Sequence, residues 1–241
     1  MGRADVALVL VDFDDTLVDT APRFQNARRS LFALLCSLGA EAAYVQQVHH
    51  ERVDPDMLER HGLGPGRLEH SFRRTYEVVS AELGWSASVE LSEQCAALGK
   101  AVAGAPPVIS GALPALQKLA RKFPTAVYTQ AADRAYQMGC IEATGVHEIV
   151  GPDRVVVCER KTAAAFQNTL SAFEVGDPAA VWMIGNSIRS DINPALEVGA
   201  RAILVEVSDP WEFDLVEPVS SDFVRASSFS HAVDYLLTLG A

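Results

Sequence analysis

The chain has 241 residues, 49% of them hydrophobic, so it can bury at least one substantial core, and its length also permits a second, smaller domain. The 20 lysines and arginines against 31 aspartates and glutamates give a formal net charge of −11, which disfavours binding to nucleic acid. The first five residues contain charged side chains rather than an apolar signal core, and no later run approaches the roughly 20 apolar residues of a membrane span. We therefore expect a cytoplasmic protein that binds neither nucleic acid nor membranes.

The first predicted element is a strand at residues 6–11, which read Val-Ala-Leu-Val-Leu-Val. A continuous apolar run of this kind is typical of a strand buried on both faces of a parallel sheet. Similar runs predict strands at 126–129, 155–158, 180–184 and 202–207. The connections carry helical periodicity at 133–144, 162–174 and 190–198, and a last helix is predicted at 230–239. This alternation of strands and helices indicates an α/β domain.

One connection is too long for this pattern. Residues 18–105 separate the first strand from the next part of the α/β domain, whereas a whole βαβ unit needs only about 30 residues. Apolar residues recur at helical spacing in 23–38, 40–47, 67–83 and 89–102, with a glycine-rich turn at 62–66. The sequence therefore predicts an all-helical domain at 18–105, inserted into a core domain formed by 1–17 and 106–241.

Polar side chains follow the predicted strands at the points where the strands end. The first strand ends in Asp12-Phe13-Asp14-Asp15-Thr16 and the second in Thr129-Gln130; the third is followed by Lys161, and the fourth by Gly185-Asn186-Ser187 and Asp191. Ligands of open α/β sheets bind beyond the carboxyl ends of the strands. We expect these residues to form one acidic, metal-binding pocket that contains a single cationic side chain.

The order of these groups resembles the four motifs of the haloacid dehalogenase (HAD) superfamily: Asp-x-Asp-x-Thr, then Thr, then Lys, then Gly-Asn-x(4)-Asp. The resemblance spans the chain, and the helical insert is similar to the C1-type cap of that superfamily. It implies a doubly wound, mostly parallel, Rossmann-like core with an inserted helical cap. It also implies a hydrolase, most often a phosphatase that acts on a small phosphorylated metabolite through an aspartyl-phosphate.

Residue roles follow from chemistry and from the resemblance together. Asp12 is the expected nucleophile, and Asp14, in its protonated form, is expected to protonate the leaving oxygen and later to activate water. Thr129 and Lys161 are expected to bind the phosphoryl group and to neutralise its charge. Gln130 is a further candidate for substrate binding.

The expected cofactor is Mg²⁺, because all the candidate ligands are oxygens: Asp12, the Asp14 carbonyl, Asn186 and Asp191. The histidines and cysteines show no spacing that would indicate zinc. Asn186 stands where an Asp is common in the superfamily, which predicts weaker metal binding or a larger role for Asp191. Asp15 stands where a Gly is frequent.

Other interpretations of the same residues are open. The Asp12–Thr16 segment and Asn186 could simply cap helices, and Asp191 could be a first-turn acid. On the same fold, the protein could be a phosphomutase or a dehalogenase, although a dehalogenase of this superfamily lacks the second Asp of the first motif. A non-catalytic binding or regulatory protein is a third possibility. We expect a monomer or a homodimer.

Overall fold

The structure is a computed structural model that describes residues 6–62, 64, 66–208 and 216–239. The chain divides into two compact units, one formed by Met1–Thr20 with Ala105–Ala241 and the other by Ala21–Gly104. Residues 1–5, which include charged side chains, and residues 63 and 65 of the turn predicted at 62–66 lie outside the described residues. No helix among the described residues is long and apolar enough to cross a membrane.

The first unit contains a six-stranded parallel sheet in the order β3-β2-β1-β4-β5-β6. The strands are β1 (Leu8–Val11), β2 (Thr125–Gln130), β3 (Val155–Cys158), β4 (Val181–Gly185), β5 (Arg201–Val205) and β6 (Val224–Ala226). The sequence predicts the first five to within two residues at either end, because each is a continuous apolar run. It does not predict β6, which has only three residues.

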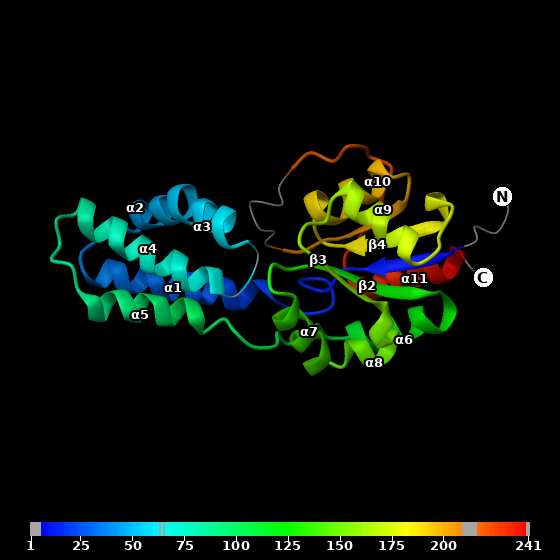
Figure 1. The fold of residues 1–241 in the computed structure, drawn as a ribbon, viewed down its shortest axis with the longest axis horizontal. Coiled ribbons are helices and arrows are strands. Elements are labelled where there is room, and N and C mark those ends of the chain that lie inside the picture. The colour runs from blue at the N-terminus through cyan, green and yellow to red at the C-terminus, as the bar shows by residue number, and fades with distance from the viewer. Residues whose placement is uncertain (1–5, 63, 65, 209–215, 240–241) are drawn as a thin grey trace. The chain divides into compact units, whose positions relative to one another are not determined.

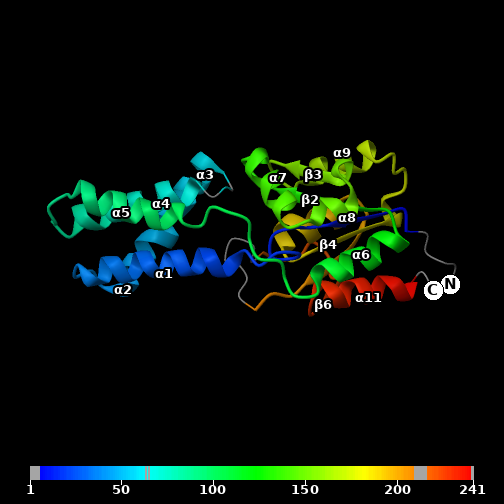
Figure 2. The same cartoon turned by 90° about the horizontal axis from the view of Figure 1, so that it is seen from below.

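Helices cover both faces of this sheet, as Figures 1 and 2 show. One face packs against α6 (Ala112–Lys122), α7 (Arg134–Ala143), α8 (Val146–Val150) and α11 (Phe229–Leu239). The other packs against α9 (Ala163–Ala172), the π-helical turn η4 (Ile188–Ile192) and α10 (Asn193–Glu197). Along β1, Val9 and Val11 belong to the first core and Leu8 and Leu10 to the second, as the alternation of side chains along a strand requires. Two short 3-10 helices, η2 (Pro152–Arg154) and η3 (Pro178–Ala180), complete this unit.

The strand order determines where a site can form. The chain passes from β1 to β2 and β3 on one side, then crosses to β4 and β5 on the other side of β1. Val11 is in register with Val127 of β2 and Ile184 of β4, so β1 and β4 end within one residue of each other and β2 continues to Gln130 beside the segment that follows β1. This is a topological switch point, where open α/β sheets bind their ligands.

Every regular element among the described residues of the second unit is a helix. It comprises α1 (Ala21–Ser37), α2 (Ala42–Gln47), the π-helical turn η1 (Val48–Val53), α3 (Asp54–His61), α4 (Gly66–Glu82) and α5 (Val89–Lys100) around one apolar core. The sequence predicts α1, α2, α4 and α5, but not η1 or α3. Gly99 allows α4 and α5 to pack closely, because a Cβ at this position would overlap the backbone carbonyl of Leu68.

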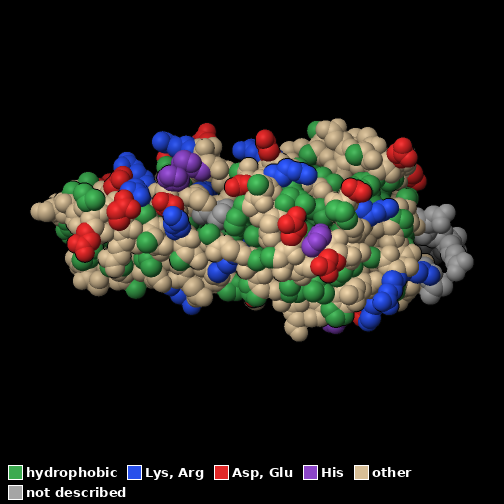
Figure 3. All heavy atoms as spheres, turned by 60° about the horizontal axis from the view of Figure 1, so that its bottom comes forward, with side chains coloured by type: hydrophobic (Ala, Val, Ile, Leu, Met, Phe, Trp, Pro, Cys, Tyr) green, Lys and Arg blue, Asp and Glu red, His purple; other side chains and the backbone are tan. Residues whose placement is uncertain are grey.

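This unit contains both exposed and buried ion pairs. The exposed pairs include Arg73 with Glu93, and Figure 3 shows basic and acidic side chains interspersed on the face in view. By contrast, Asp54 is buried and accepts hydrogen bonds from Arg67 and from Ser71 Oγ, the latter at 2.8 Å. Burial opposes the ionisation of Asp54, but the positive charge of Arg67, its hydrogen bond to Asp54, and the neighbouring His49 and Arg28 together outweigh burial and lower the pKa of Asp54 to about 2.

We predict that Asp54→Asn destabilises the protein by about 3 kcal/mol at neutral pH, because it removes the carboxylate that compensates the buried Arg67 guanidinium. The pKa of Asp54 in the folded chain, about 2, lies below the ordinary value of 3.8. Its stabilising contribution is therefore complete above about pH 4 and is lost as the pH falls toward about 2. Denaturant unfolding at several pH values measures this difference, which should shrink as the pH falls below about 4.

Glu93→Gln is the matched control, since it removes one charge from an exposed pair and should change the free energy of unfolding little. Equal losses for the two variants would contradict a specific contribution from the buried pair.

Candidate active site

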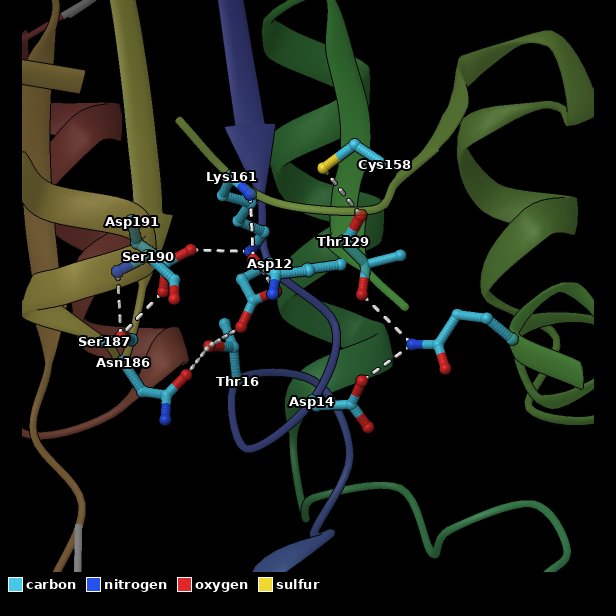
Figure 4. Close-up of polar contacts among 12 residues, drawn as sticks. Asp12, Asp14, Thr16, Thr129, Cys158, Lys161, Asn186, Ser187, Ser190 and Asp191 are labelled. Atoms are coloured by element: carbon cyan, nitrogen blue, oxygen red, sulfur yellow. Dashed lines mark hydrogen bonds and ion pairs between the residues drawn. The ribbon is translucent and has the colours of Figure 1, made fainter. Parts of the chain in front are cut away.

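A buried ammonium group joins the ends of three segments of the first unit. Lys161 Nζ lies 2.5 Å from Asp12 Oδ1 and 2.6 Å from Asp191 Oδ1, and its side chain is 3% exposed (Figure 4). Asp12 follows β1, Lys161 lies between β3 and α9, and Asp191 lies in η4 after β4. The structure therefore brings together three of the residues that the sequence predicts for the site.

The charges of this cluster perturb one another. Burial raises the pKa of Asp12 above its ordinary value, and the neighbouring Asp191 raises it further, whereas Lys161 opposes the rise. Burial alone would lower the pKa of Lys161, but the two carboxylates hold it well above its ordinary value. Two carboxylates share one ammonium group, so an additional cation beside Asp12 would favour its ionised form.

A group of oxygen atoms lies on the other side of Asp12. The amide of Asn186 places one terminal atom 3.1 Å from Asp12 Oδ2 and 3.1 Å from the Asp14 carbonyl oxygen. With nitrogen at this position, the amide donates to both acceptors; with oxygen there, three oxygens face one another and a cation among them would satisfy all three. Adjacent ligands of an octahedral Mg²⁺ lie about 2.9 Å apart, so this spacing fits the ion.

Asp191 does not belong to this oxygen group. Its Oδ1 contacts Lys161, and its Oδ2 accepts a hydrogen bond from the Ser187 backbone N–H at 2.9 Å. Among the described residues, no group of three or more His, Cys, Asp or Glu side chains could hold a metal. The candidate metal site therefore has a single carboxylate, that of Asp12, beside the carbonyl of Asp14 and the amide of Asn186.

Asp14 lies beside Thr129, at the ends of β1 and β2. Its Oδ1 accepts a hydrogen bond from Thr20 Oγ1 at 2.8 Å, and its Oδ2 accepts one from Gln137 Nε2 at 2.7 Å. The same nitrogen lies 3.0 Å from Thr129 Oγ1. Figure 4 labels Asp14 and Thr129, and one dashed line ends at each of them on this side of the site. The two aspartates of the first motif thus have different surroundings: Asp12 faces a cation, and Asp14 faces neutral donors.

The backbone after β1 turns sharply between these two aspartates and the start of the helical unit. Asp15 has a φ of 55°, in the left-handed region that favours glycine and that Asp and Asn tolerate best among the other residues. Its Oδ1 accepts a hydrogen bond from the Thr20 backbone N–H at 2.8 Å. This conformation gives a physical reason why Asp15 can stand where the superfamily often has Gly.

Gln130 makes a contact of a different kind from the predicted one. Its Oε1 accepts a hydrogen bond from the backbone N–H of Lys161 at 2.8 Å, so it holds the segment that carries the ammonium group. A direct contact of Gln130 with substrate stays a prediction. Thr16, the threonine of the first motif, has its hydroxyl 3.4 Å from Asp12 Oδ2. The sequence does not predict the contacts of Thr20 and Gln137 with Asp14, because neither residue belongs to a motif.

Comparisons with known proteins identify the family and the fold of the chain. The family described as haloacid dehalogenase-like hydrolase matches residues 6–199. The chain belongs to this family. In this hydrolase, hydrogen bonds connect the segment that follows β1, the end of β2 and the segment that follows β3, and the segment after β4 lies beside Asp12, all at the switch point of the sheet.

Several solved structures have the same fold. A haloacid dehalogenase-like family hydrolase from Xanthomonas campestris is 23% identical, with a TM-score of 0.80 and coverage of 98% of this chain and 92% of that one. A 2-haloacid dehalogenase from Pseudomonas syringae is 20% identical (TM-score 0.59; coverage 97% and 99%). The magnesium-bound HAD-hydrolase YfnB from Bacillus subtilis is 15% identical (TM-score 0.61; coverage 96% and 99%). No curated protein sequence matches the chain.

We predict that Gly185→Ala in this HAD-like hydrolase lowers the free energy of unfolding by about 3 kcal/mol or more. A Cβ at this position would overlap the carboxylate of Asp191 and displace it from Lys161, which disrupts a buried ion pair. Thermal or denaturant unfolding measures the loss. Gly176→Ala is the control, because no atom lies near its added Cβ and its stability should be almost unchanged; a similar value for both variants would contradict the steric argument.

Proposed function

We propose that this protein is a Mg²⁺-dependent phosphatase that hydrolyses a small phosphorylated metabolite in the cytoplasm through a phosphoaspartate on Asp12. The observation that carries the proposal is the pair of aspartates at the end of β1. Asp12 lies between the Lys161 ammonium and a group of oxygens suited to a cation, and Asp14 is held apart beside Thr129. Phosphoryl transfer by a carboxylate needs such a division of roles.

In the first step, a carboxylate oxygen of Asp12 attacks phosphorus, and the bond from phosphorus to the leaving oxygen breaks. Asp14 gives its proton to that oxygen, and the alcohol departs. Lys161 neutralises charge shared between Asp12 and the transferring group, and the hydroxyl of Thr129 donates to a phosphoryl oxygen. The hydrogen bonds from Thr20 and Gln137 use one lone pair on each oxygen of Asp14, which leaves a second lone pair on each oxygen for the transferred proton.

In the second step, the ionised Asp14 takes a proton from a water molecule, and the water oxygen attacks phosphorus. The bond between phosphorus and Asp12 breaks, which releases inorganic phosphate and restores both aspartates. The two steps together consume one water and yield the alcohol and phosphate.

The residues that would hold Mg²⁺ are Asp12, Asp14 through its carbonyl, and Asn186. When bound there, the ion supplies positive charge that keeps Asp12 ionised and offsets the negative charge of the phosphate. Asp191, which pairs with Lys161, then acts by holding the ammonium group in place.

A dehalogenase is the second candidate, since the similar structures include a 2-haloacid dehalogenase. In that reaction Asp12 would attack carbon and displace halide, and neither a proton donor for the leaving group nor a cation is required. The presence of Asp14 and the cation-suited oxygens beside Asp12 favour phosphoryl transfer.

One experiment distinguishes the two reactions. Phosphate release from p-nitrophenyl phosphate and a panel of sugar phosphates, nucleotides and phospho-acids is measured beside halide release from 2-chloropropionate, each with Mg²⁺ and with EDTA. The proposal predicts phosphate release that EDTA abolishes. Halide release that persists in EDTA, without phosphate release, would establish the dehalogenase.

The nucleophile gives a further prediction. Asp12→Asn should reduce phosphatase turnover at least about 100-fold, because an amide is a poor nucleophile and a weaker metal ligand. The assay follows Mg²⁺-dependent phosphate release, with circular dichroism as the check on folding. A folded variant that keeps more than about a tenth of the turnover would exclude Asp12 as the nucleophile.

The neutral ligand at position 186 allows a test of the metal site. Asn186→Asp should lower the Mg²⁺ concentration for half-maximal activity about tenfold, equivalent to ~1.4 kcal/mol, because it adds a carboxylate among the metal-facing oxygens. Turnover need not rise, since the added charge also repels phosphate. Asn168→Asp, an exposed position on α9, is the charge-matched control and should leave the half-maximal concentration unchanged. An equal value for both variants would place Asn186 outside the metal site.

A further inference from the structure

Gln137 is a buried amide that no motif of the sequence marks. It lies in α7, the helix that follows β2, and is 5% exposed. Asp133 caps the start of this helix by accepting a hydrogen bond from the Tyr136 backbone N–H at 2.9 Å, which fixes the helix close to the end of β2. The fold thereby brings Gln137 to two residues of the site, Thr129 at a separation of 8 residues and Asp14 at a separation of 123.

The contacts of Gln137 account for both hydrogens of its amide nitrogen. Nε2 lies 2.7 Å from Asp14 Oδ2 and 3.0 Å from Thr129 Oγ1. An amide nitrogen can only donate, and both contacts run from Nε2, so Gln137 is the donor to Asp14 and to Thr129. One amide hydrogen is then directed to Asp14 and the other to Thr129.

The consequence for Thr129 is a directed hydroxyl. Because Thr129 Oγ1 accepts from Gln137, the hydroxyl hydrogen points elsewhere, and among the hydrogen bonds of the described residues none has this hydroxyl as donor. It is available to a phosphoryl oxygen. Without Gln137, the hydroxyl could rotate and donate to Asp14 or to water instead.

The consequence for Asp14 is a fixed carboxylate. Thr20 Oγ1 holds one oxygen at 2.8 Å and Gln137 holds the other, so the group is restricted to one orientation beside the site. Restricting a proton-transferring group in this way lowers the entropic cost of reaching its reactive position.

We infer that Gln137 is a positioning residue that aligns the proton-transferring Asp14 and the phosphate-binding hydroxyl of Thr129 at the same time. The inference rests on the proposed phosphatase function. Gln137 would thereby couple the binding of the phosphoryl group to the protonation of the leaving group.

The test compares wild type with Gln137→Met, which keeps the length of the side chain but removes both donors, on two substrates. An alkyl phosphate has a poor leaving group and depends on protonation, whereas p-nitrophenyl phosphate has a good one and depends on it much less. We expect kcat to fall at least about tenfold on the alkyl phosphate and distinctly less on p-nitrophenyl phosphate. Gln167→Met, an exposed position on α9, is the matched control and should leave both values unchanged.

A double-mutant cycle tests the link to Thr129. If Gln137 acts through this hydroxyl, the effect of Gln137→Met on KM should be smaller when Thr129 is already Val. If the Met variant does not fold, Gln137→Glu takes its place, since it keeps the shape of the side chain but repels Asp14. Its kcat should likewise fall more on the alkyl phosphate than on p-nitrophenyl phosphate.

Each outcome decides a different claim. If Gln137→Met lowers kcat equally on both substrates, and its effect simply adds to that of Thr129→Val, then Gln137 has only a structural role. If its kinetics equal those of the wild type, Gln137 has no role in the site. Wild-type protein that releases no phosphate from any substrate would overturn the proposed function, and the inference with it.

Discussion

The ion pair network of Lys161 is the interaction on which the rest of the site depends. A single buried ammonium group connects Asp12 after β1 with Asp191 after β4. Neither carboxylate could be buried there without it, because an uncompensated charge in a protein interior costs several kcal/mol. Two neighbouring features hold this network in place: Gln130 binds the backbone of Lys161, and Gly185 leaves room for Asp191.

This network also explains the chemical asymmetry between the two aspartates of the first motif. Asp12 has an ammonium group on one side and cation-suited oxygens on the other, which favours a carboxylate ready to attack. The carboxyl group of Asp14 accepts hydrogen bonds from two neutral donors, Thr20 and Gln137, and lies beside the hydroxyl that would bind phosphate. A dehalogenase needs a carboxylate nucleophile but neither the cation-suited oxygens beside Asp12 nor a proton donor such as Asp14. The surroundings of these two residues therefore carry more functional information than the shared fold.

Much of the fold could be predicted from the sequence because its main determinants are local. A parallel strand that is buried on both faces must be continuously apolar, so β1 to β5 are visible in the sequence, whereas β6 has only three residues and gives no such signal. The sequence does not predict the π-helical turn η1 or the helix α3, which begins at Asp54, since this polar stretch lacks a clear apolar period. Asp54 is buried because it pairs with Arg67, and this pairing arises only in the folded chain. The left-handed φ of Asp15 likewise appears only in the folded chain.

The site could be predicted only in part, for a related reason. Residues that end strands are found from the strands themselves, so Asp12, Thr129 and Asn186 were identified in advance. The partners of these residues depend on the fold: Asp191 was expected beside the metal, yet both its oxygens have other contacts, with Lys161 and the Ser187 backbone. Gln137 reaches the site from the middle of a helix, where no sequence pattern distinguishes it from a residue of the core.

The central claim is that Asp12 accepts a phosphoryl group with Mg²⁺ beside it. Beryllium fluoride mimics a phosphoryl group on a carboxylate, so the most direct measurement is the melting temperature with Mg²⁺, with beryllium fluoride, and with both, for the wild type and for Asp12→Asn. The account predicts that only the combination raises the melting temperature markedly, and only in the wild type. No shift in the wild type at saturating concentrations, or the same shift in Asp12→Asn, would contradict it.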